Sequence, residues 1–214
     1  MGIVGVGVKS IDSHWGNLSA DIKPIVDKSR SDSSNLDATL EINIRSGQPI
    51  IDSLLKLVPE AFRNQPELAG REAIKSFYEY SASIQEAWDG PALLVFSDGD
   101  VVGATLDRNG LRPARYSITD DGFVVMGSET GVVELDQSKI IEKGRLGPGQ
   151  MLAVDFNKSR ILRNWDVKTE AATRFDYSKL LKKRIINLTE TSWENDCQLR
   201  DLELLQQQTA YGFS

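Results

Sequence analysis

The stretch WDGPALLVFSDGDVVGATLDRNGLRPAR, residues 88–115, decides the fold that we expect for this chain. It places two apolar segments, residues 92–96 and 101–106, on either side of Asp98-Gly99. Asp-Gly between such segments is a strong signal for a β-hairpin, because a type I′ turn needs positive φ angles that glycine tolerates. The hairpin should therefore present the polar loop that follows it, residues 107–115, at one edge of a sheet.

The rest of the pattern predicts helices first and antiparallel strands afterwards. Helices are expected at residues 35–45, ended by Ser46-Gly47, at residues 50–58 after Pro49, and at residues 67–87. Strands are expected at residues 92–96, 101–106, 114–119, 123–128, 151–156 and 160–164. We interpret residues 144–149, GRLGPG, as a turn. Helices followed by antiparallel hairpins indicate an α+β fold.

The composition disfavours several classes of protein. The 214 residues include 25 basic and 31 acidic ones, and the resulting charge of −6 disfavours nucleic acid, which binds to basic surfaces. No apolar run approaches the ~20 residues of a membrane span, and the first residues lack a signal-peptide pattern. The single cysteine, Cys197, excludes internal disulfides and fits a reducing compartment. We expect a soluble, cytoplasmic protein without nucleic-acid or membrane partners.

The loop after the hairpin is dense in charged and turn-forming residues: Asp107, Arg108, Asn109, Gly110 and Arg112. One interpretation is a structural corner, in which Gly110 supplies backbone freedom and Asp107 pairs with an arginine. The alternative is direct binding of a ligand by the same side chains. We favour the structural corner.

Several phrases of the sequence occur together, and in the same order, in one known family. They are SDSSNLD (31–37), LVPEAF (57–62), FYEY (77–80), WDGPALL (88–94), LDRNGLRPARY (106–116), SETGV (128–132) and EKGRLGPG (142–149). On these phrases the chain resembles the glutaminase domain, a class II glutamine amidotransferase, of glutamate synthase, especially the ferredoxin-dependent type. The resemblance runs from about residue 15 to 166, and LLQQQTAYG (204–212) is similar to the segment that follows the domain.

The resemblance implies a fold and a division of the chain. The family has the four-layer αββα sandwich of the N-terminal nucleophile (Ntn) hydrolases, so we expect a partial sandwich of this type. Residues 1–14 should form an unrelated or disordered leader, and residues 15–166 a partial amidotransferase domain. Residues 167–214 should form a helical tail that leads toward the next domain of longer relatives.

The resemblance also implies how chemistry is distributed. In the family, an N-terminal cysteine attacks glutamine, whereas here Met1 is followed by Gly2 and the only thiol is that of Cys197. We therefore predict no catalytic residue in this chain. Asp32 corresponds to the carboxylate that receives the α-ammonium group of glutamine, a charge-assisted hydrogen bond. Alternatively, Asp32 could cap the helix expected at residues 35–45.

Two functional hypotheses remain open. The first is a fragment of a glutamate synthase glutaminase domain, which forms glutamate and ammonia from glutamine but is inactive alone. The second is a non-catalytic remnant or interaction module, with self-association through uncovered sheet edges. Whether the chain is an enzyme by itself stays open. We expect neither FMN nor the iron–sulfur cluster of the full-length family here, and no metal at the lone His14. In a eukaryote the compartment would be the plastid stroma.

Overall fold

A computed structural model describes residues 27, 29–183, 185 and 201–211 of the chain. The chain divides into two compact units, residues 1–183 and 184–214. The expected leader, His14 and Cys197 lie outside the described residues. In the second unit, helix α7 (Asp201–Ala210) lies within the helical tail expected at residues 167–214.

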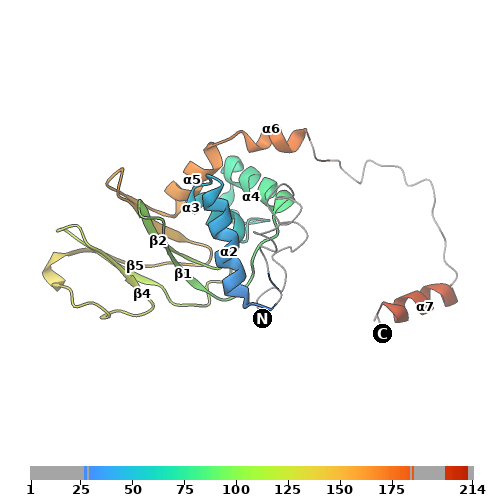
Figure 1. Cartoon of the computed structure of the whole chain (residues 1–214), viewed down its shortest axis with the longest axis horizontal. Helices are drawn as coiled ribbons and strands as arrows, with labels where there is room; N and C mark the ends of the chain where they lie inside the picture. Colours follow the sequence, from blue (N-terminus) through green and yellow to red (C-terminus); the bar gives the residue numbers. More distant parts are fainter. Residues whose placement is uncertain (1–26, 28, 184, 186–200, 212–214) are drawn as a thin grey trace. The chain divides into compact units, whose positions relative to one another are not determined.

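Three helices open the described part of the first unit (Figure 1): α2 (Asp32–Arg45), α3 (Ile50–Leu57) and α4 (Glu72–Ile84). The Ser31 hydroxyl caps α2 by accepting a hydrogen bond from the Ser34 amide over 3.2 Å. Beyond its end, Gly47 has a φ of +90°, as the expected stop signal requires. The helix expected at residues 67–87 is shorter, because a 3₁₀ turn (Pro66–Leu68) and Gly70, with φ +77°, precede α4.

Among the residues that the structure describes, seven strands form two antiparallel sheets. The four-stranded sheet has the order β1 (Leu93–Ser97), β2 (Val101–Leu106), β6 (Met151–Asp155) and β7 (Arg160–Leu162). The three-stranded sheet has the order β4 (Val124–Gly127), β3 (Arg115–Thr119) and β5 (Ile140–Arg145). The six expected strands are confirmed with small shifts at their ends. Together with the helices, they confirm the α+β fold class.

Strand β5 is the element that the sequence analysis missed. Residues 144 and 145, which we interpreted as part of a turn, pair with β3, and the turn begins only after them. The polar residues Glu142 and Lys143 alternate between half-buried and exposed positions in this strand. A strand of this composition shows no apolar alternation, so the period-two signal is absent.

The turn of the first hairpin also differs from the expectation. A type I′ turn needs two residues with positive φ, but only Gly99, at +98°, has one in this turn. The connection has three residues, 98–100, between β1 and β2. The Asp98 carboxylate accepts hydrogen bonds from the amides of Asp100 (3.1 Å) and Val101 (2.8 Å). This side-chain cap stabilises the loop in place of a second left-handed residue.

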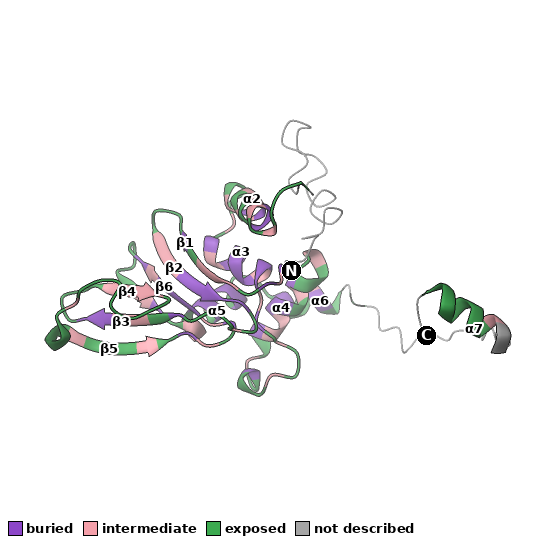
Figure 2. Ribbon diagram, turned by 90° about the horizontal axis from the view of Figure 1, so that it is seen from below, coloured by how far each residue is buried: buried purple, intermediate pink, exposed green. Residues whose placement is uncertain are grey.

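The described part of the first unit has three layers: helices, the four-stranded sheet and the three-stranded sheet (Figures 1 and 2). On one face of the four-stranded sheet, Phe96, Met151 and Leu162 pack with buried residues of the helices. On the other face, Leu106 and Leu152 form a smaller core with residues of the three-stranded sheet. This arrangement corresponds to three of the four layers of the expected sandwich.

Two further helices belong to the same core. They are α5 (Asn164–Thr173) and α6 (Tyr177–Lys182), which contribute the buried residues Val167, Ala171, Ala172 and Tyr177. The division that we expected after residue 166 falls within α5, and the compact unit continues to residue 183. The role of the later residues as a lead toward another domain stays a prediction.

Candidate functional site

Asp107 anchors the corner that follows the first hairpin. Its side chain is buried, with 1% exposure, and accepts hydrogen bonds from the backbone amides of Ala92 (3.1 Å) and Asn109 (2.9 Å). Its carbonyl accepts from the amides of Gly110 (3.1 Å) and Gly149 (2.8 Å). The expected partner, an arginine, is therefore wrong. A short carboxylate can bind the backbone of its own loop, and here that leaves the neighbouring Arg108 free for another partner.

Two glycines bring three segments of the chain into close backbone contact at this corner. Gly110 has a φ of +60°, and a Cβ there would lie 2.8 Å from Pro148 Cα. Gly149 has a φ of +61°, and a Cβ there would lie 2.5 Å from Glu60 Cβ. Side chains at either position would collide with the neighbouring segment. The phrases LVPEAF, LDRNGLRPARY and EKGRLGPG, far apart in sequence, therefore meet here.

The WDGP segment (residues 88–91) is a fourth segment that packs beside this corner. The Trp88 amide donates to the Leu57 carbonyl over 2.7 Å, and the buried indole packs with Leu36 of α2. Asp89 forms an ion pair with Arg108, which joins WDGP to the loop after the hairpin. This pair is partly exposed, so it positions the loop more than it stabilises the fold.

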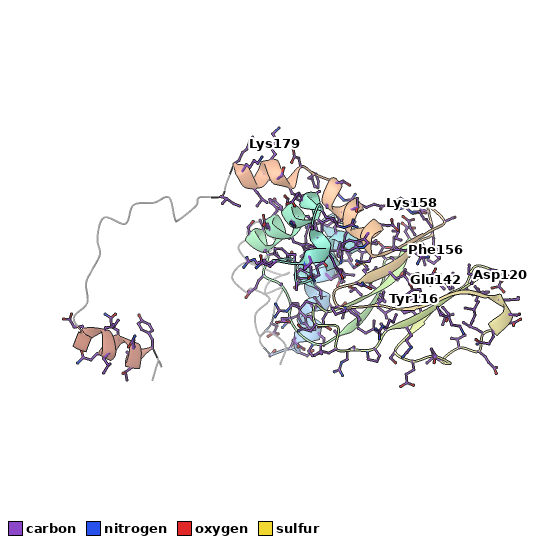
Figure 3. All side chains as sticks on the ribbon, turned by 180° about the vertical axis from the view of Figure 1, so that it is seen from behind. Tyr116, Asp120, Glu142, Phe156, Lys158 and Lys179 are labelled. Carbon is purple, nitrogen blue, oxygen red and sulfur yellow. The ribbon has the colours of Figure 1, made fainter. Side chains whose placement is uncertain are left out.

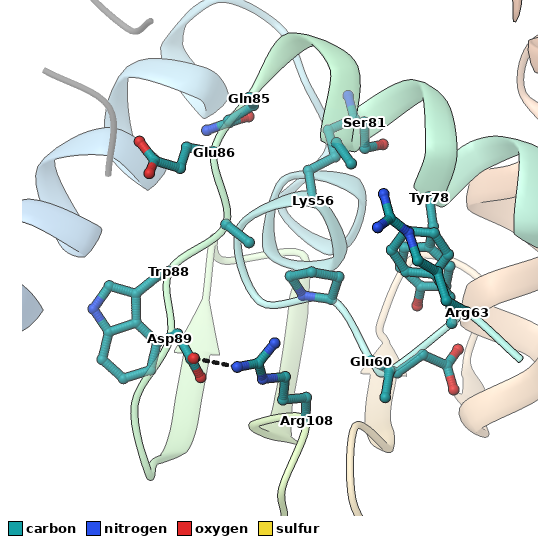
Figure 4. Close-up of a pocket in the computed structure, with 15 residues that line it drawn as sticks. Lys56, Glu60, Arg63, Tyr78, Ser81, Gln85, Glu86, Trp88, Asp89 and Arg108 are labelled. Atoms are coloured by element: carbon teal, nitrogen blue, oxygen red, sulfur yellow. Dashed lines mark hydrogen bonds and ion pairs between the residues drawn. The ribbon is translucent and has the colours of Figure 1, made fainter. Parts of the chain in front are cut away.

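A pocket of about 510 Å³ lies between these segments and α4 (Figure 4). Its lining includes three cationic side chains, Lys56, Arg63 and Arg108, and three carboxylates, Glu60, Glu86 and Asp89. Burial lowers the pKa of Lys56, whose ammonium donates to Gln48 Oε1 over 2.9 Å. The pocket has the size of a small-molecule site, and mixed charge of this kind suits a polar or zwitterionic ligand.

Glu60, which lines the pocket, forms a buried ion pair with a lysine of α5. Lys168 of α5 places its Nζ 2.9 Å from Glu60 Oε1, and the two side chains are exposed by only 1% and 6%. The approach angle is outside that of a hydrogen bond, so the contact is an ion pair. Burial lowers the pKa of Lys168, while the nearby Glu60 carboxylate opposes this shift. Burial also raises the pKa of Tyr78, which lines the pocket beside Glu60.

A second polar cluster joins the three-stranded sheet to the start of α5 (Figure 3). Tyr116 donates its hydroxyl proton to Glu142 over 2.9 Å, and Arg163 donates to both oxygens of Glu142 over 2.6 Å. Hydrogen bonds from Arg163, followed by one from Tyr116, hold the pKa of Glu142 below its usual value. This cluster fixes the sheet that carries the EKGRLGPG phrase.

The structure brings some of the predicted site residues together and leaves others apart. Arg108 lines the pocket, while Asp107, Asn109 and Gly110 form its supporting corner. Arg112 is exposed and does not belong to the described lining of the pocket. Asp32 lies in the first turn of α2, and its carboxylate accepts a hydrogen bond from the Ser33 amide over 2.7 Å. It is half-buried and outside the pocket lining.

Sequence reasoning missed Glu60, Asp89 and Lys168 as site residues. A signal for Lys168 was present, since it lies on the same helix face as Val167, Ala171 and Ala172, all of which are buried. In the described part of the chain, no cluster of three potential metal ligands occurs. Likewise, no helix among the described residues is long and apolar enough to span a membrane.

Comparison with known proteins identifies the class to which this fold and corner belong. Residues 8–180 match the family described as "Glutamine amidotransferases class-II". The match covers most of the chain, so the chain belongs to this family.

The most informative relatives are ferredoxin-dependent glutamate synthases. The chain is 48% identical over 200 residues to the protein of Pyropia yezoensis, covering 94% of this chain and 13% of the relative. It is 48% identical to "Ferredoxin-dependent glutamate synthase 2" of Synechocystis over 194 residues, covering 90% and 12%. The chloroplastic protein of Oryza sativa is 43% identical over 201 residues, covering 94% and 12%. The resemblance stated from the sequence is confirmed, and the chain spans about an eighth of the length of these relatives.

Proposed function

We propose that this chain supplies part of a glutamine-hydrolysing site of the glutamate synthase type, in which glutamine is converted to glutamate and ammonia for glutamate synthesis. The observation that carries the proposal is the convergence of LVPEAF, WDGPALL, LDRNGLRPARY and EKGRLGPG around one pocket and its corner. Asp32 contributes the carboxylate that receives the α-ammonium group of glutamine. The chloroplastic relatives support the plastid stroma as the compartment in a eukaryote, with the cytoplasm as the bacterial equivalent.

The 214-residue chain is proposed to bind substrate without turning it over. Acyl transfer from glutamine needs an activated thiolate. The single thiol of the chain belongs to Cys197, within a polar stretch that comes later in the sequence than the phrases that meet at the pocket. The chain is accordingly proposed to hold substrate contacts and no nucleophile, FMN or iron–sulfur cluster of its own.

Glutamine binding tests the assignment of Asp32. We expect Asp32→Asn to weaken glutamine binding to the full 214-residue chain at least tenfold in isothermal titration calorimetry. Asp37→Asn is the matched control, because Asp37 lies on the same helix and is exposed. Equal affinity in the Asp32→Asn variant and the unaltered chain would refute the assignment.

Turnover tests the second part of the proposal. We expect no release of ammonia from glutamine by the purified chain, measured in a coupled glutamate dehydrogenase assay. Turnover that persists in the Cys197→Ser variant would show that another group of this chain performs the chemistry, and the proposal would be wrong.

A second candidate function is that of a non-catalytic interaction module. Among the described strands, β1 is at an edge of the four-stranded sheet, and its Val95 side chain is 72% exposed. An uncovered edge with an apolar side chain favours pairing with another chain. We expect concentration-dependent self-association in analytical ultracentrifugation, reduced by Val95→Lys. A monomer at all accessible concentrations would exclude this candidate.

A further inference from the structure

Two arginines lie directly opposite each other on the three-stranded sheet. In the pairing of β3 with β5, Arg115 is the partner of Arg145, and Ser117 is the partner of Lys143. Successive side chains of a strand point to opposite faces, and Tyr116 packs on the inner face against the smaller core. Arg115, Lys143 and Arg145 therefore share the outer face.

This arrangement costs stability unless a counter-charge is present. Like charges directly opposite in an antiparallel pair repel, since the Cβ atoms of such pairs lie only about 4.5–5.5 Å apart. Within the residues that the structure describes, neither guanidinium forms an ion pair. By contrast, Arg163 is held by both oxygens of Glu142, and Arg174 donates from Nε to Asp52 over 2.7 Å. The chain has an excess of acidic residues, yet among the described ones none forms an ion pair with Arg115 or Arg145.

The two arginines line a hollow of about 350 Å³. The loop that precedes β5 folds over the outer face, and a Cβ at Gly127 would lie 3.1 Å from Val132 Cγ2. Lys143 is held at one side, where it donates to Gln137 Oε1 over 2.7 Å. Among the described residues that line the hollow, Glu129 is the only acidic one, against the three cations.

The polar and apolar parts of the hollow lie close together. Val132 and Val133 of the loop are 63% and 51% exposed, and both belong to the lining. Ser117 and Thr130 also belong to the lining, and hydroxyl groups can donate hydrogen bonds. The volume is that of a small-molecule site. It is separate from the pocket beside Arg108, with which it shares no lining residue.

We propose that this hollow binds a small molecule through an oxyanion group, either a carboxylate or a phosphate, placed between the guanidinium groups of Arg115 and Arg145. A planar guanidinium matches the two oxygens of such a group and forms paired, charge-assisted hydrogen bonds with them. A bound anion removes the repulsion between the arginines, and Lys143 adds a third positive charge. The adjacent valines accept the apolar part of the ligand.

The experiment uses the full chain at low ionic strength, with inorganic phosphate and succinate as separate probes and sodium chloride to match ionic strength. We expect at least one probe to raise the melting temperature and to bind saturably in calorimetry. A response to phosphate alone identifies a phosphoryl ligand, and a response to succinate alone identifies a carboxylate. No saturable response to either probe overturns the proposal.

Variants test whether the anion binds in the hollow between Arg115 and Arg145. Arg145→Gln should weaken binding at least tenfold, while its melting temperature without ligand stays unchanged or rises because the repulsion is relieved. Arg145→Lys keeps the charge without the planar fork and should bind with intermediate affinity. Arg112→Gln is the control, since Arg112 is exposed and outside the hollow. Equal binding by the Arg145→Gln and Arg112→Gln variants would show adventitious binding and overturn the proposal.

Discussion

The buried ion pair between Lys168 and Glu60 gives the sharpest prediction about stability. Its N–O distance of 2.9 Å equals that of the pair between Lys75 and Glu72, but the burial differs. Lys168 and Glu60 are exposed by 1% and 6%, against 32% and 75% for the other pair. Removing one partner of a buried pair costs about 3–5 kcal/mol, whereas an exposed pair contributes about 0–1 kcal/mol. The two pairs therefore share an N–O distance and differ strongly in burial.

We expect Lys168→Met to lower the free energy of unfolding by about 3–5 kcal/mol, because the Glu60 carboxylate is left without a partner. For a unit of this size, that corresponds to a fall in melting temperature of roughly 6–20 °C. The matched variant Lys75→Met should cost under about 1 kcal/mol. The double variant Glu60→Met/Lys168→Met should recover most of the loss, since an apolar pair of similar volume needs no counter-charge.

Urea denaturation followed by circular dichroism measures the free energies of unfolding of the unaltered chain, Lys168→Met, Glu60→Met and the double variant, which together form a double-mutant cycle, and that of Lys75→Met beside them. A Lys168→Met variant that lost no more stability than Lys75→Met would show that burial does not set the strength of the pair. The reasoning would also be refuted if the double variant lost the sum of the two single losses.

Three further predictions concern the corner, the core and the pH dependence of stability. Asp107→Ala should lower the free energy of unfolding by roughly 1–3 kcal/mol for each of the two backbone amides that lose their acceptor, and Asp107→Asn should cost less in the same urea titration. Gly103→Ala should cost about 1–3 kcal/mol, because a Cβ there would lie 2.6 Å from the Phe96 ring and 2.8 Å from the Leu152 carbonyl oxygen; since the carbonyl is backbone, adding Phe96→Leu should restore only part of the loss. Burial raises the pKa of Tyr177 from 10.0 to about 12, so its stabilising contribution is complete below pH 10 and is lost as the pH rises toward 12. Unfolding midpoints between these pH values should fall less steeply in Tyr177→Phe, and an equal slope would contradict the assignment.

Much of the fold follows from local patterns in the sequence. The alternation of apolar residues predicted six of the seven strands in the described part of the chain, because each of these six carries apolar side chains on its inner face. The stop signal at Gly47 gave the end of α2, and the proline before α3 gave its start. Strand β5 was not predicted, because its pairing with β3 rather than its composition makes it a strand.

Local sequence patterns predicted only part of the candidate site. The sequence indicated Asp107 and Arg108 as a charged loop, but it paired Asp107 with the wrong kind of partner. Distance along the chain hides the partners: Asp89 lies 19 residues before Arg108, and Lys168 lies more than a hundred residues after Glu60. Neither contact leaves a local periodic signal.

The amino-acid sequence by itself determined the family and most of the helices and strands of this chain, since both depend on residues that are close together along the chain. Only the tertiary structure decided which charges meet. It placed Lys168 against Glu60 inside the protein and Arg115 opposite Arg145 on its surface, because strand register and helix packing bring distant residues within reach of one another.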